Sequence, residues 1–292
     1  MTLEIPRGKY VLAVSGGVDS MVLLDMLAKR PDLALVVAHF NHNIREDSQK
    51  DQELVQDVTN EHKLPFDLGT GQLGTNASEE TARNARYTFL KQAQARHHAK
   101  AIITAHHQDD VIETAFINVI RGTDRRGLSA IVNNKEIIRP LRKVPKKQIL
   151  EYAKSNKLTW REDSTNQDVD YLRNYLRLNV LTKLTPVQKR KLISNLDKVA
   201  KINYRIDKKI ATISQTMDKS DIDRSVFAAL PNQLGNELVA QYLRETSVVD
   251  FDSNTIERLS MAIKTSKPNS MHPVKQSVVL KVGKSKAKLV TP

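Results

Sequence analysis

Short apolar runs alternate with longer periodic segments along the N-terminal part of the chain. The runs that we expect to form buried strands are Tyr10–Val14, Leu33–Phe40, Leu64–Leu68 and Ala101–Ala105. The segments that we expect to form helices are Val18–Lys29, Ser48–His62, Ser78–His97 and Asp109–Ile120. Continuous apolar strands that alternate with helices are typical of a parallel sheet covered on both faces. The pattern predicts a doubly wound, mostly parallel α/β sheet whose ligands bind beyond the carboxyl ends of its strands.

After Pro140 the pattern becomes mainly helical. The helices that we expect there are a basic one begun by Pro145, then Tyr171–Leu184, Pro186–Met217, Pro231–Thr246 and Ser253–Thr265. The last residues, 277–290, predict a small hairpin around Gly283. We therefore expect two domains, an α/β domain over residues 1–184 and a mainly helical domain with a C-terminal hairpin over residues 185–292.

Composition excludes several classes of protein. The chain has 292 residues, of which 40% are hydrophobic, enough for a sizeable core. It has no cysteine, which excludes disulfide frameworks, cysteine-ligated zinc, iron–sulfur clusters and cysteine nucleophiles. No apolar run approaches the ~18 residues of a membrane helix, and Glu4 precedes only a very short apolar stretch, unlike a secretory signal. We expect a soluble, cytoplasmic protein without a membrane partner; whether it forms a homodimer is left open.

The formal net charge of +13 is concentrated in one stretch of the chain. Residues 121–209 hold 23 Lys and Arg against 9 Asp and Glu, whereas the rest of the chain is close to neutral. A block of one sign suits a polyanion such as RNA, because each neutralised phosphate releases counterions. A basic, solvated face with no partner is the alternative. Aromatic residues make up only 5% of the chain, which argues against extensive base stacking.

The segment SGGVDS, Ser15–Ser20, lies between the first predicted strand and the first predicted helix. Gly16 and Gly17 allow backbone N–H groups to crowd around an anion, and the helix that begins at Val18 directs its positive end there. Ser15 and Ser20 add hydroxyl donors. The segment lacks the lysine of a Walker A loop, so it suits an ATP whose pyrophosphate is held as a leaving group. A tight turn with Asp19 or Ser20 as a helix cap is the alternative.

Polar side chains follow the second predicted strand, and arginines lie on the third predicted helix. His39, Asn41, His42 and Arg45 come at the edge of the sheet where a nucleotide would bind, although an ordinary polar loop is the alternative. Arg83 and Arg86 are three residues apart and share a helix face, so they can clamp a phosphate or a carboxylate. Surface pairing of Arg83 with Glu79 and Glu80 is the alternative.

The densest group of titratable residues consists of His106, His107, Asp109, Asp110 and Glu113. Its carboxylates suit Mg²⁺ or the cationic amine of a small substrate. Helix capping with a solvated face is one alternative, and a zinc site is another. Further along, the basic loop Arg121–Arg126 can contact RNA or cover a nucleotide. Arg173, Asn174 and Arg177 lie on one predicted helix, with Arg173 and Arg177 on the same face.

These motifs resemble those of the PP-loop ATP pyrophosphatases, and within that group the tRNA(Ile)-lysidine synthetases. SGGVDS is similar to the signature of the whole superfamily. The stretches that narrow the resemblance follow the family's order and are His39–Arg45, Ala77–Leu90, Thr104–Gly122, Gly127–Ile131, Ile138–Leu141 and Arg161–Arg177. The resemblance covers residues 8–184 and implies an adenine nucleotide alpha hydrolase-like fold.

The resemblance also implies an activity and its residues. It implies an ATP- and Mg²⁺-dependent ligase that adenylylates the wobble cytidine of tRNA(Ile) and joins free L-lysine to it, releasing pyrophosphate and AMP. Nucleotide-binding residues would be Ser15, Gly16, Gly17, Val18, Asp19, Ser20 and His39, with Asp19 also on Mg²⁺. Catalytic residues would be Asp19, Arg83, His106, Asp109, Asp110 and Glu113. Residues on the lysine or tRNA side would be Arg86, Arg121, Arg173, Asn174 and Arg177, and residues 185–292 would face the tRNA.

The chain departs from the family pattern in a few places, and two other functions stay open. Val111 stands where the family commonly has glutamine, and the family's DPSN pattern is DSTN here, Asp163–Asn166. One alternative is another PP-loop ATP pyrophosphatase, although sulfur transfer is excluded because the family's thiolation members need cysteines. The other alternative is an RNA-binding module with an inactive nucleotide site, which the intact SGGVDS segment argues against.

Overall fold

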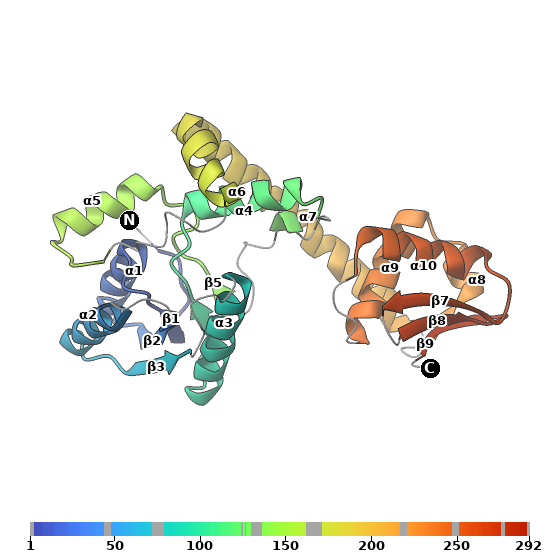
Figure 1. Cartoon of the computed structure of the whole chain (residues 1–292), viewed down its shortest axis with the longest axis horizontal. Coiled ribbons are helices and arrows are strands. Elements are labelled where there is room, and N and C mark those ends of the chain that lie inside the picture. Colours follow the sequence, from blue (N-terminus) through green and yellow to red (C-terminus); the bar gives the residue numbers. More distant parts are fainter. Residues whose placement is uncertain are drawn as a thin grey trace. The chain divides into compact units, whose positions relative to one another are not determined.

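The computed structural model of the chain consists of two compact units, Met1–Ala200 and Lys201–Pro292 (Figure 1). The residues that it describes are 3–43, 48–71, 79–123, 125, 127–129, 136–161, 171–216, 221–246, 251–275 and 278–290. Arg45, Ser78 and Asp163–Asn166, which the sequence singles out, lie outside them. No helix among the described residues is long and apolar enough to cross a membrane.

The first unit is built on a five-stranded sheet. Its strands are β1 (Gly8–Ala13), β2 (Leu33–Asn41), β3 (Phe66–Thr70), β4 (Ala101–Ile103) and β5 (Ile137–Ile138). They lie in the order β3-β2-β1-β4-β5, and every neighbouring pair is parallel. The predicted parallel sheet is therefore confirmed. The short β5 was not predicted.

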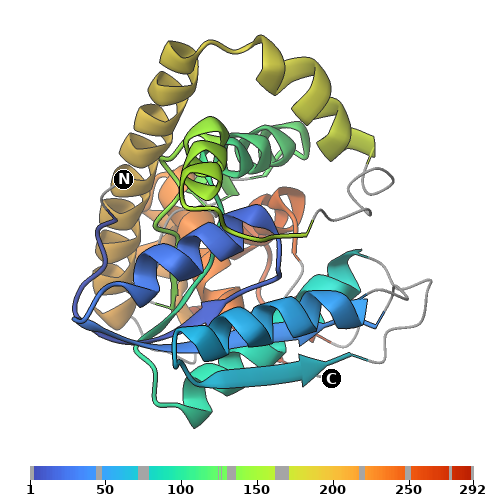
Figure 2. The ribbon, with the colours of Figure 1, turned by 90° about the vertical axis from the view of Figure 1, so that its left-hand side faces the viewer.

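Helices cover both faces of this sheet. They are α1 (Val18–Ala28), α2 (Ser48–Glu61), α3 (Glu79–Arg96) and α5 (Lys146–Ser155), whereas α4 (Gln108–Ile120) packs against later segments. Side chains of β1 alternate, so Tyr10 and Leu12 pack with α1, α2 and α5, whereas Val11 packs with Phe89 of α3 on the opposite face. α1 and α2 lie on the same side of the sheet (Figure 2). This arrangement confirms the doubly wound fold and brings the loops after β1, β2 and β4 to one edge.

The predicted helix Tyr171–Leu184 is broken into three short pieces. α6 (Tyr171–Tyr175) is followed by a π-helical turn over Leu176–Val180 and a 3₁₀ turn over Leu181–Lys183. The long helix α7 (Pro186–Thr216) then begins. Leu181 and Ile193 pack against Val111 and Ile112 of α4, which holds these pieces beside the start of α4.

The second unit contains a four-stranded antiparallel sheet in the order β6-β9-β8-β7. Its elements are β6 (Ile222–Asp223), α8 (Arg224–Ala228), α9 (Asn232–Glu245), α10 (Ser253–Thr265), β7 (Ser270–Lys275), β8 (Val278–Val282) and β9 (Lys286–Val290). The predicted hairpin is formed by β8 and β9. Leu280 and Val282 of β8 are buried with Phe227, Leu243 and Ile263 from the helices, so the unit has its own core.

Candidate active site

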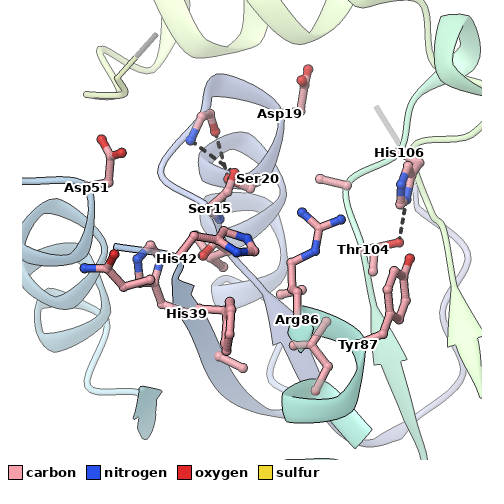
Figure 3. Close-up of a pocket in the computed structure, with 18 of the residues that line it drawn as sticks. Ser15, Asp19, Ser20, His39, His42, Asp51, Arg86, Tyr87, Thr104 and His106 are labelled. Atoms are coloured by element: carbon pink, nitrogen blue, oxygen red, sulfur yellow. Dashed lines mark hydrogen bonds between the residues drawn. The ribbon is translucent and has the colours of Figure 1, made fainter. Parts of the chain in front are cut away.

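A cavity of about 370 Å³ lies at the carboxyl ends of β1, β2 and β4. Residues from the loop after β1, the end of β2, the helix α3 and the start of α4 surround it (Figure 3). Eight of the predicted site residues line it: Ser15, Gly17, Asp19, Ser20, His39, Arg86, His106 and Asp110. The place of the cavity agrees with the ligand-binding edge of doubly wound sheets.

The loop between β1 and α1 is shaped by hydrogen bonds among its own residues. Gly16 has a φ of 91°, a conformation that favours glycine. The Ser20 hydroxyl donates to the Gly17 carbonyl at 2.9 Å and accepts from the Ser15 amide at 3.2 Å. Gly17 is the N-cap of α1 and has no side-chain capping bond, so neither Asp19 nor Ser20 caps this helix. Val18 packs instead against the hydrophobic core.

Asp19 is held by a lysine from a distant part of the sequence. Both of its carboxylate oxygens accept hydrogen bonds from Lys146 Nζ, at 2.7 and 2.8 Å, and His107 Nε2 lies 3.9 Å from Oδ2. No group of three or more His, Cys, Asp and Glu side chains within the described ranges is placed to hold a metal ion. The carboxylate of Asp19 at the cavity fits Mg²⁺, which commonly binds through one or two carboxylates, phosphate oxygens and water.

Polar side chains at the end of β2 make contacts within the protein. His39 is buried and its Nδ1 is 2.9 Å from the carbonyl oxygen of Val14, which ties β2 to the end of β1. Burial lowers the pKa of His39 and favours a neutral ring. Asn41 donates to Gln52 Oε1 at 3.2 Å. Both residues line the cavity, so they shape its wall beside the loop.

The structure separates the two arginines that the sequence places on one face of α3. Arg86 is half-buried and lines the cavity, whereas Arg83 is exposed. Both guanidinium groups lie over the Tyr87 ring, at 4.9 Å for Arg83 and 5.7 Å for Arg86. Figure 3 shows Arg86 between the loop and His106. Arg86 is therefore the arginine of this pair that can contact a phosphate in the cavity.

His106 and His107 have different roles at the start of α4. His106 Nδ1 is 2.9 Å from the Thr104 hydroxyl, and its ring lines the cavity. His107 is the N-cap of α4: its ring accepts from the Asp109 amide, and its own amide donates to Asp110 at 2.8 Å. The capping role that the sequence offered as an alternative is therefore confirmed for Asp110, which also lines the cavity.

The environment of His106 lowers its pKa to about 4. Burial is the main cause, and the cations Arg139, Arg86 and Arg83 add to it, while the carboxylate of Asp110 opposes the shift. His106 is therefore a neutral imidazole near pH 7 and can accept a proton.

An NMR titration of the imidazole resonances tests this environment. We expect the His106 ring to stay neutral as the pH falls from 8 to about 5, because its pKa is lowered in the folded protein. The unfolded chain binds this proton near pH 6.5. The contribution of His106 to the free energy of unfolding is therefore fully present above pH 6.5 and is lost as the pH falls towards 4. A midpoint near pH 6.5 for the signal that disappears in a His106→Gln variant would contradict the prediction.

The remaining carboxylates of α4 face arginines and a lysine from later helices. Glu113 is 2% exposed; its Oε1 lies 2.5 Å from Arg173 Nε, and its Oε2 accepts from Arg177 Nε at 2.6 Å. Burial raises the pKa of Glu113, and both arginines oppose this shift. Asp110 is 3.4 Å from Arg177, and Asp109 is 2.8 Å from Lys189 of α7. This carboxylate cluster, Asp109, Asp110 and Glu113, lies beside the cavity and reaches it through Asp110.

The other predicted substrate residues lie outside the cavity lining. Arg173 belongs to α6 and Arg177 to the π-helical turn that follows it, and both contact Glu113. Asn174 is half-buried beside them, and Arg121 is exposed at the end of α4. Asp124 and Arg126 of the predicted basic loop lie outside the described residues. Lys146 was not among the predicted site residues, and its only signal in the sequence was its position at the start of the basic helix begun by Pro145.

Comparisons with known proteins place these motifs in a family. The sequence profile of the PP-loop domain matches residues 3–184. A tRNA(Ile)-lysidine synthase of Streptococcus thermophilus (strain CNRZ 1066) is 32% identical over 284 residues, which are 93% of this chain and 64% of that protein. The tRNA(Ile)-lysidine synthase of Thermotoga maritima is 36% identical over 188 residues, which are 61% of this chain and 45% of that protein. The chain thus spans less than two thirds of each of these relatives.

A solved structure shares the fold. The U34-tRNA thiolase NcsA from Methanococcus maripaludis, with its 4Fe-4S cluster, superposes with a TM-score of 0.56 at 20% identity. The likeness covers 68% of this chain and 74% of that one. It supports the doubly wound architecture alone, and the absence of cysteine from this chain leaves no thiolate to bind a similar cluster.

Proposed function

The chain belongs to the PP-loop family, and we propose that it is an ATP-dependent ligase that joins free lysine to the wobble cytidine of tRNA(Ile) with a CAU anticodon. The observation that carries this proposal is the position of Asp110, which belongs both to the ATP-sized cavity and to the carboxylate cluster around Glu113. One helix, α4, thereby joins a phosphate-binding corner to carboxylates and paired cations, which are the partners that the ammonium and carboxylate groups of an amino acid need. The names of the relatives support the same substrate pair.

The first step transfers AMP to the nucleobase. The carbonyl oxygen of the cytidine attacks the α-phosphorus of ATP, the bond to the β-phosphate breaks, and pyrophosphate leaves. The Gly17 amide and the N-terminus of α1 hold phosphate oxygens, and Arg86 stabilises the charge that develops on the α-phosphate. Magnesium bound with ATP, next to Asp19, would supply further positive charge at the phosphates.

The second step replaces AMP with lysine. The uncharged ε-amine attacks the activated ring carbon, and AMP departs with the former carbonyl oxygen. Asp110, which lines the cavity, provides a carboxylate for the cationic amino acid, and neutral His106 is placed to take the proton that the amine loses. Arg173 and Arg177, which pair with Glu113, are cations beside the same cluster. The carboxylate group of the substrate lysine can pair with one of them.

The tRNA is expected to contact the basic stretch 121–209. This stretch contains α5, α6 and most of α7. Exposed side chains such as Lys154, Arg190 and Lys191 lie on its helices. Their charge attracts a polyanion and gives binding a steep salt dependence.

Pyrophosphate release separates the two steps and tests the proposal. With ATP and unmodified tRNA(Ile) but no lysine, we expect up to one equivalent of pyrophosphate per bound tRNA, because adenylylation needs no amine. Lysine should then allow multiple turnovers, and the Asp19→Ala variant should stay near background. Release that needs neither tRNA nor lysine would favour another PP-loop ATP pyrophosphatase, and RNA binding with no release at all would favour the inactive module.

A further inference from the structure

The loop Ser15–Ser20, which we propose binds phosphate, contains no lysine, but a lysine from another element contacts it. Residues 15–20 contain no cation, whereas a triphosphate brings several negative charges to this corner of the cavity. One side chain that contacts this corner is that of Lys146, the first residue of α5, which binds Asp19 from 127 residues away in the sequence. Its Nζ contacts both carboxylate oxygens of Asp19, which lines the same cavity as Ser15 and Gly17.

The position of α5 does not depend on this ion pair. Ile149 and Ala153 of α5 are fully buried in the core with α1. The Tyr152 hydroxyl also donates to the buried carboxylate of Asp25 on α1, at 2.7 Å. On the other side, the Gln108 amide donates to the Val144 carbonyl at 3.1 Å and fixes the turn before Lys146. The backbone of Lys146 is therefore held in place while its side chain can change partners.

The side chain of Lys146 is partly exposed to solvent. The Lys146 side chain is 35% exposed, and that of Asp19 is 28% exposed. A lysine has a flexible four-carbon stem, so its ammonium group can move several ångströms without a change in the backbone. Solvent screens a partly exposed ion pair such as this one, which lowers the free-energy cost of an exchange of partners. A dianionic pyrophosphate group is a stronger partner for the ammonium than one carboxylate.

We propose that Lys146 is a phosphate-binding residue of the ATP site, which rests on Asp19 in the free protein and moves to the β- and γ-phosphates when ATP binds. This inference rests on the proposed use of ATP. Lys146 thereby supplies from α5 the cation that a Walker A loop carries within itself. Its departure also frees the carboxylate of Asp19, and its ammonium neutralises the pyrophosphate that leaves in the first step.

The neighbouring residue offers a matched control. Lys147 lies on the same helix turn, its side chain is 87% exposed, and it is 3.9 Å from Glu151 on the surface of α5. A Lys147→Gln variant removes the same charge from the same helix without touching Asp19. Any long-range effect of charge alone would therefore appear in this variant as well.

Binding of ATP and of AMP, measured by titration calorimetry with magnesium present, tests the proposal. We expect Lys146→Gln to weaken ATP binding about 10- to 100-fold, as for the loss of a charged hydrogen-bonding partner. AMP lacks the β- and γ-phosphates, so its affinity should change less than about 3-fold. Lys146→Arg should recover most of the ATP affinity, and Lys147→Gln should bind both nucleotides as the unaltered protein does.

Two results would overturn the assignment. If Lys146→Gln binds ATP as tightly as the unaltered protein, the lysine makes no phosphate contact. If it loses ATP and AMP equally, the ion pair only supports the loop. An unaltered protein that binds ATP but makes no lysidine contradicts the proposed function and leaves this comparison intact, whereas one that binds no ATP contradicts both.

Discussion

Replacing Arg86 with glutamine is expected to lower kcat/KM for tRNA-dependent pyrophosphate release about 100-fold, the typical loss when one preorganised donor to a developing anion is removed. The Arg86 guanidinium lies at the cavity between the loop after β1 and His106 (Figure 3). It is the arginine of α3 that can contact the α-phosphate during attack. Steady-state pyrophosphate release at varied ATP concentration measures the effect.

Arg83 provides the control for this experiment. It lies one helical turn away, contacts the same Tyr87 ring, and is exposed outside the cavity lining. We expect Arg83→Gln to lower kcat/KM less than about 5-fold, because a distant exposed charge is screened by solvent. Equal losses in the two variants would show that the arginines act through Tyr87 or through the shared electrostatic field at His106 and not by contact with the nucleotide.

Replacing Glu113 with glutamine should affect both stability and lysine use. The change leaves Arg173 and Arg177 without the buried carboxylate that they share. Removal of one partner from a fully buried pair costs about 3–5 kcal/mol. We expect about 2–3 kcal/mol here, because the arginines are 28% and 40% exposed and solvent screens part of their charge. Urea unfolding measures this loss.

Steady-state kinetics at varied lysine concentration measure the effect of this substitution on catalysis. Under conditions where the Glu113→Gln variant is folded, the KM for lysine should rise at least about 10-fold, since Arg177 loses the carboxylate that holds it beside Asp110 at the proposed lysine site. Glu151→Gln, which removes an exposed carboxylate paired with Lys147 on α5, should change stability by about 0.5 kcal/mol or less. A folded Glu113→Gln enzyme with an unchanged KM for lysine would assign Glu113 a purely structural role.

The sheet and its helices were predictable because local patterns determine them. The strands around Leu12, Val36 and Ile102 are continuous apolar runs, and each is followed by a helix of recognisable period. The two-residue strands β5 and β6 are too short to leave a pattern, and β7 contains Pro273 among polar residues. The break at Leu176–Val180 was also missed, since its residues favour a helix and the π-helical turn instead accompanies the contact of Arg177 with Glu113.

The sequence predicted which residues form the site better than it predicted which residues they contact. Helical spacing placed Arg83 and Arg86 on one face, but the burial of Phe89 and Leu90 against the sheet decides which arginine points into the cavity. The contacts of Lys146 with Asp19 and of Arg177 with Glu113 join residues 127 and 64 positions apart. No local period encodes such pairs, so they follow only from the way α5 and the π-helical turn pack against α1 and α4.

The mass of the wobble nucleoside tests the central claim most directly. Unmodified tRNA(Ile) with a CAU anticodon is incubated with the protein, ATP, Mg²⁺ and lysine, then digested to nucleosides and analysed by mass spectrometry. The account predicts that one cytidine at the first anticodon position gains the mass of lysine less one water, and that this product is absent with the Asp19→Ala variant or without ATP. An unchanged cytidine in the presence of a protein that binds both ATP and the tRNA would contradict it.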